Sequence, residues 1–243
     1  MDYQVHLVDV KNAGGNYIWL IEHCPSKTVV VVDPTEAAVV EAYCLQQHLS
    51  IQQIWLTHWH KDHTGGVADL IQSRSIPVFG PELEQEKIPF ITHPLGDLSQ
   101  IHFHDLNIQI LHVPGHTLGH IVYYAAQIES LFCGDTLLAM GCGRLFEGSY
   151  TQMFNSLQRL KTLPHATKIY CTHEYTLSNA EFAITVEPEN LDLQQRHVEV
   201  QQLRAQQQAT LPSQLSLELA TNPFLRVANV EQFQKIRQLK DQF

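Results

Sequence analysis

The chain has few cationic side chains, and this shortage limits the partners that it can attract. Its 243 residues carry 15 Lys and Arg against 25 Asp and Glu, a formal net charge of −10 at pH 7. Binding to nucleic acid or to an anionic membrane surface depends on clustered positive charge. We therefore expect neither partner, and an anionic substrate must be attracted by a local cationic patch.

Cysteine is also scarce, and its spacing argues against a disulfide framework. The five cysteines are odd in number and form no C-x-x-C pair, which suits a reducing compartment. No apolar run approaches the roughly 20 residues of a membrane span. The first residues, MDYQVHLVDV, lack the charged-then-apolar order of a signal peptide. We expect a cytoplasmic protein and, by default, a monomer.

Short apolar runs dominate the first two thirds of the chain and predict a sheet-rich domain. Strands are expected at residues 3–10, 16–23, 28–33 and 51–58, with a helix at 36–49. A strand–helix–strand order predicts that 28–33 and 51–58 pair in parallel. A second group follows, with strands at 107–113, 120–126, 130–135 and 167–173 and a helix at 150–163.

The composition changes near residue 174, where β-branched runs become rare. A Gln-rich helix is expected at 191–208 and a last helix at 230–240. We therefore predict an α/β protein with a catalytic domain at 1–173 and a small helical domain at 174–243.

The strongest chemical signal is the segment THWHKDHTGG at residues 57–66. It places His58, His60, Asp62 and His63 at the end of a predicted strand. Residues two apart on a strand share a face, so His58 and His60 are expected to bind one ion. Burying three imidazoles and a carboxylate without a common partner would be costly. The segment therefore indicates a metal site rather than a solvated polar loop.

Three further candidates follow other predicted strands: His116 in VPGHTLGH, Asp135 in FCGDT and His173 in YCTHEY. Each of them alone could be structural, but with the first segment they complete two coordination spheres. No G-x-S-x-G segment offers a nucleophilic serine, and Cys133 is expected to pack rather than react. A water activated by two metal ions is the expected nucleophile.

This arrangement of ligands resembles the metallo-β-lactamase superfamily. The segments THWHKDHTGG, VPGHTLGH, FCGDTL, GCGRLFEG, THEYT and RQLKDQF together resemble, more narrowly, the hydroxyacylglutathione hydrolases, or glyoxalase II family. The resemblance implies an αββα sandwich with the metal ions at one edge. It places one ion on His58, His60 and His116 and the other on Asp62, His63 and His173, with Asp135 bridging them.

The resemblance also implies a reaction. Two divalent ions would bind per chain, zinc being favoured by the Irving–Williams order while iron and manganese stay open. The enzyme would hydrolyse S-lactoylglutathione to glutathione and D-lactate, the second step of methylglyoxal detoxification, by attack of a hydroxide that bridges the ions. Asp62 and Asp135 would be the catalytic carboxylates. A thioester suits this chemistry because a thiol, with a pKa of about 8.5, leaves with little need for a general acid.

Substrate-binding residues are carried over from the same resemblance: Arg144, Phe146, His173, Tyr175, Arg237 and Lys240. Phe146 stands where many family members have tyrosine. Arg237 and Lys240 are three residues apart on the predicted last helix, so they share a face. They match the family cations that bind the glycine carboxylate of glutathione. Asp33, in VVDP, is expected to support a ligand histidine rather than to bind an ion.

Four alternatives remain at this point. A lactonase or β-lactamase of the superfamily would share the metal ligands but would need neither Arg144 nor the pair Arg237 and Lys240. An oxygen-using relative with one iron conflicts with the second set, Asp62, His63 and His173. A nucleic-acid processing protein conflicts with the net charge of −10. A non-catalytic metal-binding module would turn over no thioester.

Overall fold

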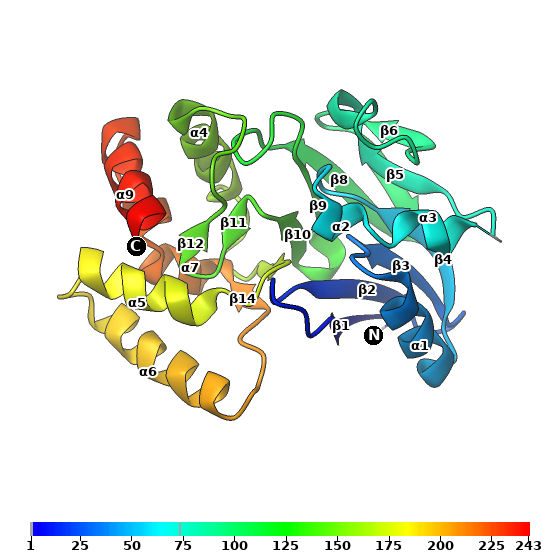
Figure 1. Cartoon of the computed structure of the whole chain (residues 1–243), viewed down its shortest axis with the longest axis horizontal. Coiled ribbons are helices and arrows are strands. Elements are labelled where there is room, and N and C mark those ends of the chain that lie inside the picture. The colour runs from blue at the N-terminus through cyan, green and yellow to red at the C-terminus, as the bar shows by residue number, and fades with distance from the viewer. Residues whose placement is uncertain (1, 73) are drawn as a thin grey trace. The chain divides into compact units, whose positions relative to one another are not determined.

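The computed structural model describes residues 2–72 and 74–243, which divide into two compact units. Unit 1 contains the chain up to His112 together with Gly119–Ile128. Unit 2 contains Val113–Leu118 and Glu129–Phe243 (Figure 1). Within the described ranges, no helix is both long enough and apolar enough to cross a membrane.

Unit 1 contains a six-stranded sheet whose strands follow chain order. The strands are β1 (Tyr3–Asp9), β2 (Tyr17–His23), β3 (Thr28–Val32), β4 (Ser50–Trp55), β5 (Val78–Pro81) and β6 (His93–Leu95). Strands β1, β2 and β3 pair antiparallel, whereas β3 to β6 pair in parallel. The expected parallel pairing of β3 with β4 is confirmed, with Val32 opposite Trp55. Asp33 and the residues after Trp55 therefore emerge at the same edge of the sheet.

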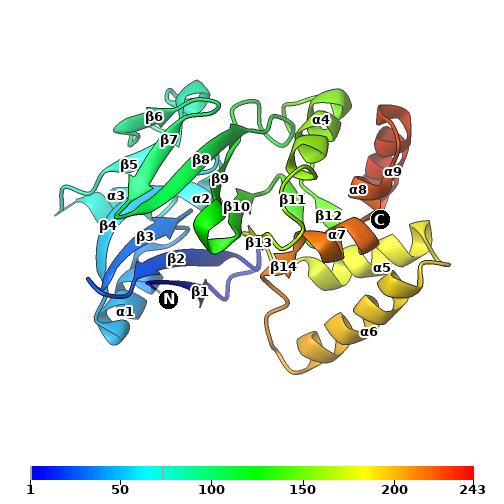
Figure 2. The ribbon, with the colours of Figure 1, turned by 180° about the vertical axis from the view of Figure 1, so that it is seen from behind.

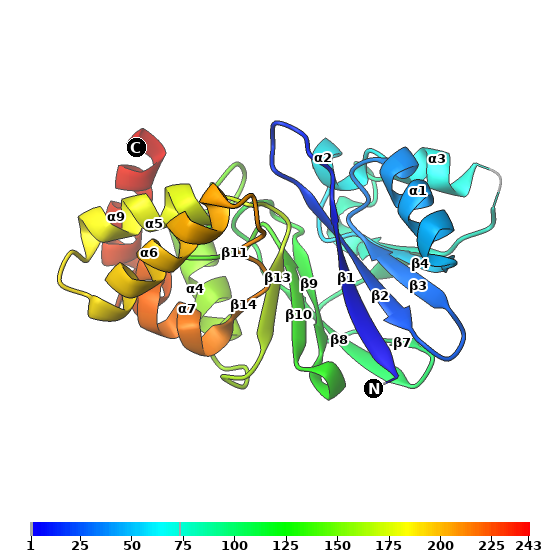
Figure 3. The ribbon, with the colours of Figure 1, turned by 90° about the horizontal axis from the view of Figure 1, so that it is seen from below.

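Helices cover one face of this sheet and a second set of strands faces the other (Figure 3). The helices are α1 (Ala37–Gln47), α2 (Lys61–Thr64) and α3 (Val67–Ile71); the facing strands, best seen in Figure 2, are the antiparallel β7 (Gln100–Phe103), β8 (Leu106–His112) and β9 (Ile121–Ala125). Val40 and Leu70 pack with Val29 and Val31 in one core cluster.

Aromatic stacking joins the two sets of strands in unit 1. The Trp55 ring of β4 stacks on Tyr123 of β9 with ring centroids 5.0 Å apart. The Tyr123 hydroxyl donates a 2.8 Å hydrogen bond to the Leu56 carbonyl, directly before the segment that carries His58. The start of this segment is therefore held by the buried stacking of Trp55 and by the hydrogen bond from Tyr123.

Unit 2 combines a short set of strands with six helices. Its strands are β10 (Ser130–Gly134), β11 (Leu137–Leu138), β12 (Gly141–Cys142), β13 (Lys168–Cys171) and β14 (Ser213–Gln214); its helices are α4 (Tyr150–Leu160), α5 (Thr176–Val186), α6 (Leu191–Ala205), α7 (Leu215–Thr221), α8 (Pro223–Arg226) and α9 (Val230–Gln242). Strands β10 and β13 pair in parallel, so their carboxyl ends meet. Asp135 and His173 follow those two ends.

Buried polar side chains from the helices hold the turn of the β11–β12 hairpin. Asn179 donates to the Ala139 carbonyl (3.0 Å), and the Glu218 carboxylate accepts from the Met140 amide (2.8 Å). Asn222 donates to the carbonyls on either side of this turn, at 3.1 and 3.0 Å. Glu218 is fully buried. We call Asn179, Glu218 and Asn222 the hairpin clamp; it fixes the chain between Asp135 and Arg144.

Candidate metal centre

The segment THWHKDHTGG does not lie on a strand as expected. The predicted strand 51–58 ends at Trp55, so His58 and His60 lie in the loop after β4, and Asp62 and His63 lie in α2. His58 and His60 therefore do not share a strand face, and the pairing predicted on that ground is wrong. Nevertheless the side chains converge: His58 Nε2 lies 3.0 Å from His60 Nδ1, and His63 Nε2 lies 3.7 Å from Asp62 Oδ2.

Asp33 explains why the strand ends early. Its side chain is 2% exposed, and its Oδ1 accepts a 2.8 Å hydrogen bond from the Thr57 amide. Its Oδ2 accepts from the Thr57 hydroxyl (2.7 Å) and from His63 Nδ1 (2.9 Å). The Thr57 amide therefore bonds a side chain instead of a neighbouring strand, and the chain turns out of the sheet.

These hydrogen bonds also select the tautomer of two candidate ligands. Because the Thr57 hydroxyl donates to Asp33, its oxygen accepts from His58 Nδ1, at 3.0 Å. His58 and His63 then both carry their proton on Nδ1, which leaves on each Nε2 the lone pair that a metal ligand needs. This geometry agrees with the supporting role expected for Asp33.

In unit 2, one carboxylate oxygen lies between two imidazoles. Asp135 Oδ2 is 3.4 Å from His116 Nε2 and 3.3 Å from His173 Nε2. His116 Nδ1 donates to the Arg144 carbonyl (2.7 Å), which again leaves Nε2 as the ligand atom. Two ligands bound at 2.0–2.1 Å to one tetrahedral zinc ion lie about 3.3–3.4 Å apart. The spacing around Asp135 therefore fits ligands that share a divalent ion.

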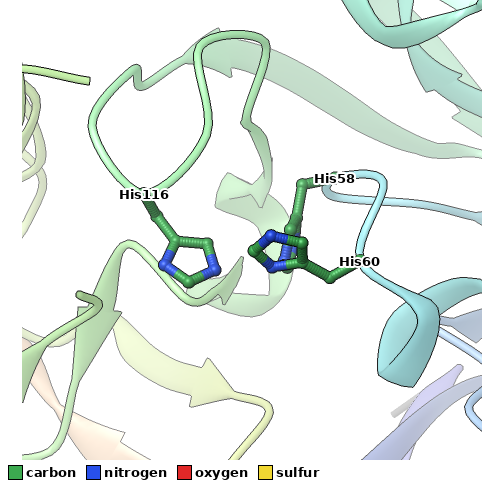
Figure 4. A group of neighbouring side chains, drawn as sticks. All are labelled: His58, His60 and His116. Atoms are coloured by element: carbon green, nitrogen blue, oxygen red, sulfur yellow. The ribbon is translucent and has the colours of Figure 1, made fainter. Parts of the chain in front are cut away.

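The geometry groups all seven expected ligands into sets that could hold an ion. Among the described residues, three sets have ligand atoms within 4.8 Å of one another: His58, His60 and His116; His58, His63 and Asp135; and Asp62, His63 and His173. Figure 4 shows the first set. The assignment of each residue to one ion remains a prediction.

Glycine is required at one position close to these ligands. A Cβ atom at Gly143 would lie 1.9 Å from the Asp135 carbonyl oxygen and 2.9 Å from His116 Nδ1. Any other side chain would therefore force apart the loops that carry Asp135 and His116.

Two exposed aromatic rings flank the imidazoles of unit 2. Tyr175 stacks on His173 with ring centroids 4.6 Å apart and an interplanar angle of 3°. Phe146 meets His116 edge to face at 5.3 Å and is 61% exposed. Both rings are therefore exposed directly beside candidate metal ligands.

The three expected cations differ in accessibility. Arg144 is exposed, whereas Arg237 is buried and donates to the Cys142 carbonyl (2.9 Å). Lys240 donates to the Ser178 carbonyl (3.1 Å), and burial, together with the nearby Arg237 charge, lowers the pKa of Lys240 to about 8. The structure therefore leaves Arg144 as the most accessible charge, and the roles of the three remain predictions.

Several residues around the centre were not expected from the sequence. Asn16 donates to the Asp62 carboxylate (3.2 Å), and the Thr35 hydroxyl donates to the Asp62 carbonyl (2.7 Å). His120 is fully buried and stacks on His58 with centroids 4.7 Å apart. Asp241 lies beside two of the cations. Only His120 carried a signal, its position four residues after His116.

The cysteines of unit 2 offer no competing nucleophile. Cys133, Cys142 and Cys171 are buried, and burial raises the pKa of each thiol above its usual range. A thiol that stays protonated at neutral pH is a weak nucleophile. The packing role expected for Cys133 fits this environment.

Family models cover nearly the whole chain. The metallo-beta-lactamase superfamily matches residues 12–173, and the hydroxyacylglutathione hydrolase C-terminus matches residues 174–243. The hydroxyacylglutathione hydrolase of Pseudomonas paraeruginosa is 53% identical over 216 residues, 88% of this chain and 83% of the relative. That of Shewanella baltica is 48% identical over 235 residues, 94% and 88% of the two chains.

Solved structures agree on the fold. The BLEG-1 B3 metallo-beta-lactamase superposes with a TM-score of 0.72 at 20% identity, covering 92% of this chain and all of that one. The expected αββα sandwich with a C-terminal helical part is confirmed. From the extent of the two family matches and the identity to its relatives, the chain belongs to the hydroxyacylglutathione hydrolase family of the metallo-beta-lactamase superfamily.

Proposed function

We propose that this enzyme hydrolyses the thioester of S-lactoylglutathione to glutathione and D-lactate, the second step of methylglyoxal detoxification. The observation that carries the proposal is the Asp135 carboxylate, whose Oδ2 lies 3.4 and 3.3 Å from two imidazole nitrogens. The names of relatives about 50% identical support the choice of substrate.

Seven residues would hold two divalent ions. His58, His60 and His116 would bind one ion and Asp62, His63 and His173 the other, with Asp135 shared. Imidazole and carboxylate ligands suit zinc, which the Irving–Williams order favours over iron and manganese. Such ions would supply Lewis-acid chemistry: they would lower the pKa of a water to about 7 and would polarise a carbonyl oxygen.

The residues around the ligands hold them in the required state. Asp33 keeps His63 protonated on Nδ1 and, through Thr57, does the same for His58. Asn16 and Thr35 hold Asp62 from its side chain and its carbonyl, so that this carboxylate keeps its orientation. The protein therefore presents its ligands with little rearrangement, which is what electrostatic stabilisation of a reaction requires.

Recognition of an anionic thioester would depend on unit 2. The chain carries a net charge of −10, so local cations must offset repulsion of the substrate. Arg144 and Lys240 would supply this charge, and Arg237 lies next to them. Phe146 and Tyr175, exposed beside His116 and His173, would pack against the bound thioester. His173 would contact the substrate from within the metal centre.

A comparison of three substrate classes tests this function. Metal-loaded protein should hydrolyse S-lactoylglutathione with a kcat/KM far above that for a β-lactam or a lactone. A lactoyl thioester of N-acetylcysteine, which lacks the tripeptide, should be a poorer substrate because of a higher KM. Faster turnover of the β-lactam or the lactone would reject the proposed substrate and leave the superfamily assignment intact.

We further propose that the enzyme works as a cytoplasmic monomer. The five cysteines are all free thiols, which suits a reducing compartment. Light scattering of the purified protein should give a mass near the 27.7 kDa of one chain. A mass of two chains would reject the monomer.

A further inference from the structure

One carboxylate, that of Asp241, lies between two guanidinium groups of unit 2. Its Oδ1 is 3.3 Å from Arg144 Nε and 3.0 Å from Arg237 Nη2. Its carbonyl also accepts a 3.3 Å hydrogen bond from Arg144 Nη2. Arg144 follows β12, whereas Arg237 and Asp241 lie one turn apart on α9. The contact therefore joins residues that are 97 positions apart in the chain.

Arg237 makes contacts within unit 2 that hold α9 in place. Its side chain is 6% exposed, and its Nη1 donates to the carbonyl of Cys142, two residues before Arg144. The Phe224 ring lies 5.2 Å from its guanidinium carbon. A buried guanidinium is destabilising unless it is paired, so the Asp241 carboxylate is what makes this position tolerable. Arg237 thereby links α9 to β12.

Arg144 is the accessible member of the group. Its side chain is 57% exposed, and only Nε and Nη2 are engaged by Asp241. Its backbone carbonyl accepts the hydrogen bond of His116 Nδ1. The residue is thus fixed at its backbone by a candidate metal ligand and at its side chain by Asp241. A long flexible side chain held in this way loses less conformational entropy when it binds a ligand.

We propose that Asp241 is a positioning residue that holds the Arg144 guanidinium, with Arg237 as a buried support, where it meets a carboxylate of the substrate. The proposal rests on the proposed glutathione thioester. Charge alone would have the opposite effect, because a carboxylate beside the cations repels an anionic substrate. Removal of the Asp241 charge therefore raises KM if Asp241 positions Arg144, and lowers KM if it only repels.

The variant Asp241→Asn tests the sign of this effect, since it keeps the size of the side chain. KM for S-lactoylglutathione should rise about two- to fivefold, the range of a partly exposed charged contact, while kcat stays within about twofold. Glu231→Gln, which removes one exposed negative charge from the first turn of the same helix, should leave KM unchanged. Asp241→Glu should restore part of the loss.

A second substrate separates positioning from a general loss of structure. With S-lactoylglutathione amidated at its glycine carboxylate, wild-type protein and Asp241→Asn should have similar KM values. A lower KM in the variant, an unchanged KM, or an equal rise with both substrates would overturn the proposal. If the wild-type protein does not hydrolyse S-lactoylglutathione, both the proposed function and the role of Asp241 are overturned. If the wild-type protein is active, any of the three KM results above overturns the role of Asp241 alone.

Discussion

Replacing Asp33 with Asn should change the protonation of a metal ligand without changing the size of the side chain. Asp33 Oδ2 accepts from His63 Nδ1 and from the Thr57 hydroxyl, and Oδ1 accepts from the Thr57 amide. If the amide nitrogen of the new asparagine took the Oδ1 position, it would face the Thr57 backbone N–H, and two donors would then point at each other. The amide nitrogen therefore takes the Oδ2 position and donates to His63 Nδ1, so the His63 proton moves to Nε2.

A proton on Nε2 removes the lone pair with which His63 would bind its ion. Loss of the group that orients a ligand histidine typically weakens metal binding about 10- to 100-fold. This corresponds to about 1.4–2.7 kcal/mol of binding free energy. The Thr57 hydroxyl oxygen has two lone pairs, so it can accept from the new amide while it still accepts from His58 Nδ1. His58 then keeps its tautomer, and the cost in folding free energy should stay within about 1–3 kcal/mol. We expect a folded protein with one weakened metal site.

Competition with a coloured chelator measures the two metal affinities directly. Asp33→Asn should show one dissociation constant raised about 10- to 100-fold and a melting temperature only several degrees lower. Asp69→Asn, the same change at an exposed position of α3, serves as the matched control. Two ions bound by Asp33→Asn with wild-type affinities would refute the tautomer argument.

Asp135→Ala should lose most activity and bind one ion per chain or fewer; two tightly bound ions with normal turnover would show that Asp135 does not bridge. Because the pKa of Lys240 is about 8, Lys240 loses its charge between about pH 7 and pH 9, and KM for the anionic thioester should rise by up to about tenfold over this range. Lys240→Arg should abolish this rise, and a KM of the wild-type protein that does not change with pH would contradict the prediction. Glu218→Ala should destabilise the fold by about 3–5 kcal/mol in denaturant unfolding, since it leaves the buried Arg196 without its carboxylate partner and breaks the hairpin clamp. A loss below about 1 kcal/mol would reject that role.

The sequence predicts long, buried elements well because their apolar runs are continuous. The strands expected at 3–10, 28–33 and 120–126 correspond to β1, β3 and β9 within two residues at each end. The helix expected at 230–240 corresponds to α9, Val230–Gln242. Parallel pairing of β3 with β4 also follows from local order alone, since a helix separates the two strands.

Short elements were missed because few residues carry their pattern. Strand β7 (Gln100–Phe103) alternates exposed and buried residues, yet four residues cannot distinguish a strand from a loop. Helix α5 (Thr176–Val186) is longer, but its buried face includes the polar Thr176 and Asn179 beside Ala180 and Ala183, so its sequence lacks a clear apolar stripe. Strand 51–58 was predicted too long because Leu56 continues the apolar run, while the Thr57 amide bonds Asp33, 24 residues away.

The metal ligands could be predicted, whereas the residues that hold them mostly could not. The segment THWHKDHTGG concentrates four candidate ligands, three histidines and one aspartate, in six residues, so its chemistry can be inferred before the fold is known. In contrast, the contact of Glu218 with the Met140 amide joins positions 78 residues apart, and neither residue is unusual in its local sequence. Asp241 lies in the segment RQLKDQF, from which only Arg237 and Lys240 were predicted to bind substrate. Its contact with Arg144 depends on the packing of α9 and cannot be read from the local sequence.

We propose that two metal ions, held by the two ligand sets, together support thioester hydrolysis. The most direct test is to titrate metal-free protein with Zn²⁺ and to measure S-lactoylglutathione hydrolysis and bound metal on the same samples. We predict that activity is low up to about one ion per chain and rises to its maximum as the second ion binds. Full activity with one ion per chain, or no hydrolysis with two ions bound, would contradict this account.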